Sequence, residues 1–184
     1  MNLKRTRLIT ETAVMVALAV VLSYVKFDAP WAYGGSISLE MVPILLMAFR
    51  RGVEAGLVTG LIFGIVNFLL NPYLVHPVSI LVDYPLAFLL VGIAGVFRLK
   101  AGDARLLNGA RLFLGTLLGS GLRFAAHFVS GIVWWGSYAP EGTPVVVYSL
   151  VYNLGYMIPS FLLSAVVLIL LYFGAPKLFQ ASES

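Results

Sequence analysis

Long runs of apolar residues, separated by short polar connections, make up most of this 184-residue chain. A helix that crosses a membrane needs about 20 mostly apolar residues, whereas the strands of a membrane barrel alternate polar and apolar positions over about 10 residues. The runs here are continuous, so they predict helices. We expect six spans, at about residues 8–25, 39–50, 53–71, 77–98, 110–135 and 145–173.

The connections between these runs contain residues that end helices. Asn71-Pro72 ends the third run, because proline disfavours the helical conformation of the residue before it. The sequence GSYAPEGTP, between the fifth and sixth runs, is rich in glycine and proline and is typical of a turn. No repeat or change of composition divides the chain, so residues 1–184 are predicted to form a single transmembrane domain.

Composition supports the membrane assignment. Hydrophobic residues account for 60% of the chain and charged residues for 11%, whereas a soluble domain has roughly 25% charged residues. Six spans leave no room for a soluble catalytic domain, and the absence of cysteine excludes disulfides.

The distribution of basic residues predicts the orientation. If the N-terminus is cytoplasmic, ten of the 12 basic residues fall at inner ends, which agrees with the positive-inside rule. These ten are Lys4, Arg5, Arg7, Arg50, Arg51, Arg98, Lys100, Arg105, Arg111 and Lys177. The net charge of +4 is therefore a topology signal rather than a nucleic-acid footprint. The predicted fold class is an all-α integral membrane protein, a six-transmembrane-helix bundle with both termini cytoplasmic.

A few polar residues interrupt the predicted spans. Because a charge within the membrane is costly, such a residue is a functional candidate. Asp83, His127 and Asn153 lie six to eight residues from the outer ends of three spans, roughly 9–12 Å deep at 1.5 Å per residue. Arg123 lies one turn before His127 on the same face. Three helices that bring polar groups to one depth predict a pocket open to the outside.

Aromatic residues gather at the same outer level. They are Trp31, Tyr33, Tyr73, Tyr84, Trp134, Trp135, Tyr138, Tyr148 and Tyr152. One interpretation is an interfacial aromatic belt. The predicted inner ends contain no tryptophan, however, which favours a ligand site. Aromatic rings around a carboxylate suit a flat organic cation.

Structural roles are the alternative for each polar residue. Asp83 could form a buried ion pair with Arg123, and His127 could bond a neighbouring helix. Glu40 is expected to cap the second span at its positively polarised end rather than to contact a ligand.

Small residues form a second pattern. Gly56, Gly60 and Gly64 recur every fourth residue, and we expect them to pack against another helix of the same chain. Ala13 and Ala17 have the same spacing in the first span, where docking to another membrane protein is an option.

Several segments together identify a family resemblance. They are TETAVMVALA, PILLMAFRRGVEAGLVTGLIFG, Tyr73 with Asp83-Tyr84 ten residues later, GIAGVFR, LRFAAHFVSGIVWWGSYAPEG and YSLVYN. In this order and at these spacings, nearly the whole chain resembles the thiamine-specific substrate-binding subunits (S components) of energy-coupling factor (ECF) transporters.

The resemblance implies a six-helix fold with a thiamine pocket near the outer face, capped by the loop after the first helix. The ligand residues it implies are Tyr73, Asp83, Tyr84, His127, Gly131, Trp135, Tyr148 and Asn153, with Trp31 in the loop. Asp83 stands where the family has a glutamate. Ala13 and Ala17 are implied to contact a transmembrane coupling subunit, which works with two ATP-binding cassette ATPases.

The sequence thus predicts a multi-pass protein of the bacterial plasma membrane that captures thiamine and is not an enzyme. No cofactor or metal is expected, and no P-loop is present for ATP hydrolysis. One alternative is a subunit of the same class that binds another vitamin or a thiamine precursor. Another is an intramembrane enzyme using Asp83 and His127 as an acid–base pair, although no zinc or serine-hydrolase motif accompanies them.

Overall fold

The computed structural model describes residues 3–28, 35–100 and 102–180. The long helices are α1 (Leu3–Tyr24), α3 (Val53–Leu70), α6 (Arg105–Val133) and α7 (Val145–Gly174), and α2 (Met41–Arg51) is shorter. A broken helix consists of α4 (Pro77–Leu81), the π-helical η1 (Val82–Leu86), α5 (Ala87–Val91) and the 3₁₀ segment η2 (Gly92–Phe97). Strands β1 (Lys26–Phe27) and β2 (Ile37–Ser38) pair antiparallel, and 3₁₀ turns η3 (Gly136–Tyr138) and η4 (Pro176–Phe179) follow α6 and α7.

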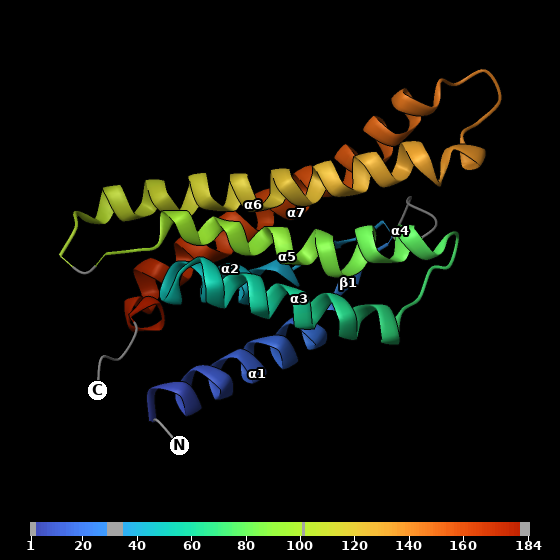
Figure 1. The fold of residues 1–184 in the computed structure, drawn as a ribbon. Coiled ribbons are helices and arrows are strands. Elements are labelled where there is room, and N and C mark those ends of the chain that lie inside the picture. The colour runs from blue at the N-terminus through green and yellow to red at the C-terminus, as the bar shows by residue number, and fades with distance from the viewer. Residues whose placement is uncertain (1–2, 29–34, 101, 181–184) are drawn as a thin grey trace.

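Among the described residues, five helical segments are long and apolar enough to cross a membrane. They are α1, α3, the broken helix from Pro77 to Phe97, α6 and α7. The beginning of α1 and the end of α7 lie at the same end of the bundle (Figure 1). The predicted fold class, an all-helical membrane bundle, is confirmed.

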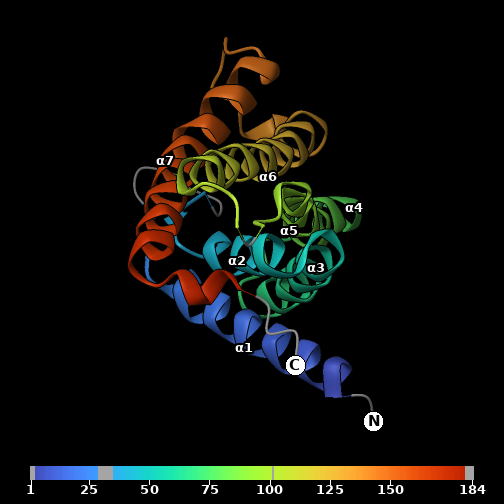
Figure 2. The ribbon, with the colours of Figure 1, turned by 90° about the vertical axis from the view of Figure 1, so that its left-hand side faces the viewer.

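The short helix α2 lies at the centre of the bundle, as the end-on view shows (Figure 2). Residues Met41–Phe49 are all buried, and α2 contacts α1, α3, η2, α6 and α7. Eleven residues rise only about 16 Å at 1.5 Å each, which is too short to cross a membrane alone. The longer helices around α2 cover its apolar surface.

The glycine stripe of α3 packs against the broken helix, as predicted. A Cβ atom on Gly60 would lie 2.1 Å from the carbonyl oxygen of Phe88, and one on Gly64 would lie 2.5 Å from that of Tyr84. The two backbones therefore touch. Between helices in lipid, close packing of this kind replaces the hydrophobic effect as a source of stability.

The helix from Pro77 to Phe97 is irregular at the residues that matter most for the site. Pro85 lies inside η1 and has no N–H to donate, so the regular hydrogen-bond ladder is interrupted. Asp83 and Tyr84 both line the same cavity, although they are adjacent in the sequence. The sequence predicts one continuous span here and does not predict this π-helical turn.

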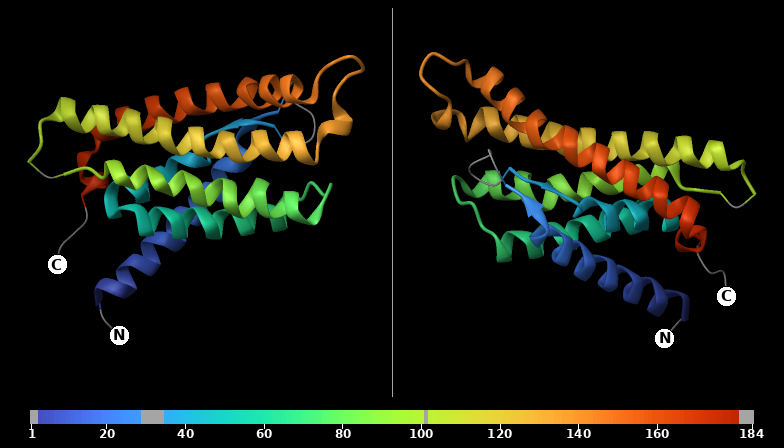
Figure 3. Two further views of the ribbon diagram at one scale, coloured as in Figure 1. Left: turned by 45° about the horizontal axis from the view of Figure 1, so that its top comes forward. Right: turned by 180° about the vertical axis from the view of Figure 1, so that it is seen from behind.

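Helix α1 crosses the bundle obliquely, and its N-terminal half diverges from the other helices (Figure 3). Glu11 joins it to the end of α2, with Glu11 Oε1 2.8 Å from Arg51 Nη2 and 3.0 Å from Arg50 Nη2. Arg50 also donates to the carbonyl oxygen of Leu178, 3.1 Å away, near the C-terminus. This cluster fixes α1 against the inner end of the bundle.

Candidate ligand-binding site

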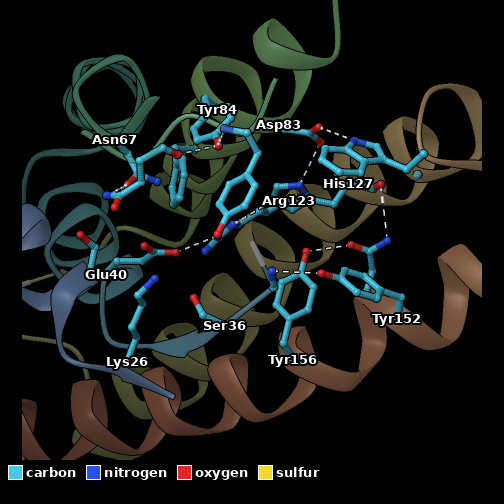
Figure 4. A pocket seen from close by; sticks show the side chains of 18 of the residues that line it. Lys26, Ser36, Glu40, Asn67, Asp83, Tyr84, Arg123, His127, Tyr152 and Tyr156 are labelled. Carbon is cyan, nitrogen blue, oxygen red and sulfur yellow. Dashed lines mark hydrogen bonds and ion pairs between the residues drawn. The ribbon is translucent and has the colours of Figure 1, made fainter. Parts of the chain in front are cut away.

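A cavity of about 130 Å³ lies at the outer end of the bundle, opposite the Glu11 cluster. Its walls come from β1, α3, η1, α6 and α7 (Figure 4). Eight of the nine predicted ligand residues line it: Tyr73, Asp83, Tyr84, His127, Gly131, Trp135, Tyr148 and Asn153. The ninth, Trp31, lies outside the described residues.

Asp83 receives hydrogen bonds from three side chains of the α6 region. Ser130 Oγ and Trp135 Nε1 donate to Oδ2 over 2.7 Å and 3.2 Å, and His127 Nδ1 lies 3.2 Å from Oδ1. A carboxylate accepts hydrogen bonds at both of its oxygens, so these contacts fix the orientation of the Asp83 side chain. The wall of the cavity therefore presents an oriented negative charge.

Arg123 pairs with Glu40 rather than with Asp83. Arg123 Nη2 lies 2.7 Å from Glu40 Oε1, and both side chains are more than nine-tenths buried. The alternative of an Asp83–Arg123 ion pair is therefore wrong. Asp83 instead faces His127, which lies one helical turn farther along α6.

Glu40 has a different role from the predicted helix cap. It occupies the N-cap position of α2, but its side chain makes no capping hydrogen bond. The carboxylate turns toward Arg123 and lines the cavity, because a buried guanidinium is a stronger partner than the backbone N–H groups.

Asn153 is held by neighbours on its own helix. Its Nδ2 donates to the carbonyl oxygen of Ser149 over 2.8 Å, and Tyr156 Oη donates to its Oδ1 over 2.7 Å. An amide oxygen has two lone pairs, so Oδ1 can accept a further hydrogen bond from a ligand. On α6, a Cβ on Gly131 would lie 2.2 Å from Ser149 Oγ and 3.0 Å from Ser149 Cβ, so a larger residue there would displace the Ser149 side chain.

Tyr84 fixes the chain that follows α3. Its hydroxyl donates to the carbonyl oxygen of Asn71 over 2.8 Å and accepts from the backbone N–H of Tyr73 over 2.9 Å. Tyr73 is thereby placed at the rim of the cavity.

Comparison with known proteins identifies the family. The model of the thiamine transporter protein (Thia_YuaJ) family matches residues 9–180. The chain belongs to this family.

Two bacterial relatives are likewise named as thiamine transporters. The thiamine transporter ThiT of Bacillus subtilis is 44% identical over 95% of this chain and 94% of its own length. The ThiT of Lacticaseibacillus paracasei is 33% identical over 98% of this chain and 94% of its own.

Solved structures give the same fold. The structure of ThiT from Listeria monocytogenes superposes with a TM-score of 0.89 at 30% identity, covering 97% of this chain and all of that one. The S component of a bacterial ECF transporter superposes with a TM-score of 0.67 at 20% identity, covering 94% of this chain and 97% of that one. At this identity the match supports the fold alone. The chain is thus a multi-pass protein of the bacterial plasma membrane.

In this member of the family, Trp135 and not Trp134 lines the cavity. A regular helix would turn Trp134 toward the His127 face, but α6 ends at Val133. Trp134 instead stacks on His76, with ring centroids 5.8 Å apart and an interplanar angle of 15°. The end of the helix therefore selects which tryptophan faces the site.

Sequence reasoning missed several lining residues. Glu40 and Lys26 lie near span ends, where charges are ordinary, and Ser149 and Tyr156 carry no signal of their own. Ser130, which donates to Asp83, carries no such signal either. The cavity also reaches the segment after the first loop, where Gly35 N donates to Tyr152 Oη over 3.1 Å. Among residues 3–28, 35–100 and 102–180, no group of three potential metal ligands occurs.

Proposed function

We propose that this protein is the substrate-capture subunit of a vitamin uptake transporter and binds thiamine in the cavity at its outer end. The observation that carries the proposal is the Asp83 carboxylate, aligned by three donors within an aromatic cavity. Thiamine combines a cationic thiazolium ring with an aminopyrimidine, and both parts have partners here.

The thiazolium ring is assigned to Asp83 and Trp135. A cation gains from a nearby carboxylate and from the face of an indole ring. Because Trp135 Nε1 donates a hydrogen bond to Asp83, the indole ring and the carboxylate lie side by side.

The aminopyrimidine is assigned to the α7 side of the cavity. Asn153 Oδ1 can accept a hydrogen bond from the amino group, and Tyr148 lies five residues before it on the same helix and also lines the cavity. Tyr73, Tyr84, His127 and Gly131 complete the proposed contacts. Trp31, which lies outside the described residues, is proposed as a further ligand residue.

Transport requires energy that this chain has no motif to supply. We infer that a transmembrane coupling subunit and two ATP-binding cassette ATPases drive release of the vitamin. Ala13 and Ala17 are exposed on α1 and offer a small-residue surface for the coupling subunit.

Ligand competition tests the function. The purified protein is expected to bind thiamine tightly, its separated pyrimidine and thiazolium halves weakly, and unrelated vitamins not at all. Equal affinity for the pyrimidine half and for thiamine would indicate a precursor transporter instead. Recovery of a chemically altered ligand would indicate an enzyme.

Co-purification tests the partner surface. Ala13→Trp and Ala17→Trp are expected to reduce assembly with the coupling module while leaving thiamine binding unchanged. Val58→Trp, on the exposed face of α3, is the matched control for added bulk in the membrane. Equal loss of assembly in all three variants would argue against the α1 surface.

A further inference from the structure

Arg123 lies at the centre of a buried chain of polar contacts that joins Glu40 to Asp83 (Figure 4). Its Nη2 donates to Glu40 Oε1 over 2.7 Å, and its Nε donates to His127 Nε2 over 3.3 Å. Its guanidinium carbon lies 4.1 Å from the centroid of the Phe88 ring. The guanidinium is thus held by a carboxylate, a ring face and an imidazole.

These contacts determine which nitrogen of His127 carries the proton. The arginine Nε–H can only donate, so His127 Nε2 must accept. In a neutral imidazole the other nitrogen then bears the hydrogen. Nδ1–H is consequently directed at Asp83 Oδ1, 3.2 Å away. The opposite tautomer would set two N–H groups against each other and turn a lone pair toward the carboxylate.

We propose that Arg123 and Glu40 are positioning residues for the cation site: they hold His127 in the Nδ1–H tautomer, which orients Asp83 toward a cationic ligand. Glu40 also neutralises Arg123, so a guanidinium within the site does not repel the cation. Asp83 is then left as the carboxylate available to the ligand. This inference rests on the proposed function, since the cation is the thiazolium of thiamine.

The alternative is that Arg123 and Glu40 only brace α2 against α6. Both roles would affect stability, but only the first determines the position of a proton. The charged and titratable groups facing His127 are Asp83 of η1, Arg123 of its own helix and Tyr156 of α7, whose ring centroid is 6.3 Å away. Glu40 acts through Arg123, and Lys26 lines the cavity from β1, where it pairs with Asp28.

The chain is well suited to a direct measurement, because it contains two histidines, His76 and His127. Nitrogen-15 NMR of histidine-labelled His76→Gln protein in lipid nanodiscs, without thiamine, observes the side chain of His127 alone. We expect a protonated Nδ1 and an unprotonated Nε2. A protonated Nε2 in this protein would overturn the proposal.

Two variants separate positioning from bracing, each measured in the His76→Gln background. Arg123→Lys keeps a donor and is expected to preserve the tautomer and most of the thiamine affinity. Arg123→Met combined with Glu40→Gln removes the donor without leaving a buried charge. We expect it to populate the Nε2–H tautomer and to weaken thiamine binding about tenfold or more.

An unchanged tautomer in the folded double variant would contradict the proposal. If the double variant does not fold, as judged by gel filtration, the NMR spectrum of the His76→Gln protein that retains Arg123 still tests the proposal, because it shows which nitrogen of His127 is protonated. Because that spectrum is recorded without ligand, a failure to bind thiamine would refute the proposed function and leave the tautomer assignment standing.

Discussion

Trp135 Nε1 donates a hydrogen bond to Asp83 Oδ2 over 3.2 Å, linking residues that are 52 positions apart in the sequence. The bond fixes the indole beside the carboxylate, so an aromatic face and a negative charge form one surface of the cavity. Asp83 and Trp135 are each expected to contribute to ligand affinity, and substitution of each residue tests its contribution.

Replacement of the carboxylate tests the charge. Asp83→Asn retains the size of the side chain but removes the negative charge and turns one acceptor into a donor. We expect thiamine affinity to fall about 10- to 100-fold, since a hydrogen bond or contact to a charged group is worth about 1.5–3 kcal/mol. Isothermal titration calorimetry measures the change. The same substitution should reduce the affinity for an uncharged thiamine analogue much less. An equal loss of affinity for thiamine and for the analogue would point to a distorted pocket.

The two adjacent tryptophans form a matched pair. Trp135→Phe removes the donor to Asp83 and reduces the stacking area, so thiamine affinity should fall by roughly tenfold. Trp134→Phe alters only a residue stacked on His76 and should leave affinity unchanged. Quenching of tryptophan fluorescence by thiamine should disappear mainly in the Trp135 variant. Loss of the signal in the Trp134 variant alone would contradict the assignment.

The contact between α3 and α5 should not tolerate a methyl group. In Gly60→Ala the new Cβ would lie 2.1 Å from the carbonyl oxygen of Phe88, so the backbones must separate. We expect a loss of about 1–3 kcal/mol in stability, measured as a lower Tm in detergent. Gly121→Ala on α6 is the control, because its Cβ would meet nothing within 4 Å. There, alanine should stabilise the helix by up to about 1 kcal/mol.

The Glu11 cluster should control how firmly α1 is held. Glu11→Gln removes the carboxylate that binds Arg50 and Arg51, so we expect a loss of about 1 kcal/mol in stability. Spin labels at the exposed positions Val14 and Val58 should then report a broader distribution of distances between α1 and α3. Glu54→Gln, at an exposed position in the first turn of α3, is the control. Equally broad distributions for both variants would show that Glu11 does not fix α1.

Much of the fold could be read from the sequence because its causes are local. Continuous apolar runs require helices in lipid, and the basic residues determine which ends are cytoplasmic. The glycine spacing in α3 likewise predicted a close helix contact, because glycines at every fourth position leave one face of the helix without side chains, whichever helix packs there.

The pairing of charges could not be read in this way. An Asp83–Arg123 ion pair is one alternative that the sequence leaves open, but in the structure Glu40 reaches Arg123 from the centre of the bundle. Its position depends on α2 being a short helix that packs inside the bundle, where its N-terminal end meets α6.

The sequence by itself thus determined the membrane helices, their orientation and the chemistry gathered near the outer face, because hydropathy and charge act residue by residue. Only the tertiary structure decided that Asp83 faces His127 and Trp135, and that Arg123 turns to Glu40. Those contacts depend on the π-helical turn at Pro85 and on the end of α6 at Val133, where small changes in backbone direction select which side chain enters the cavity.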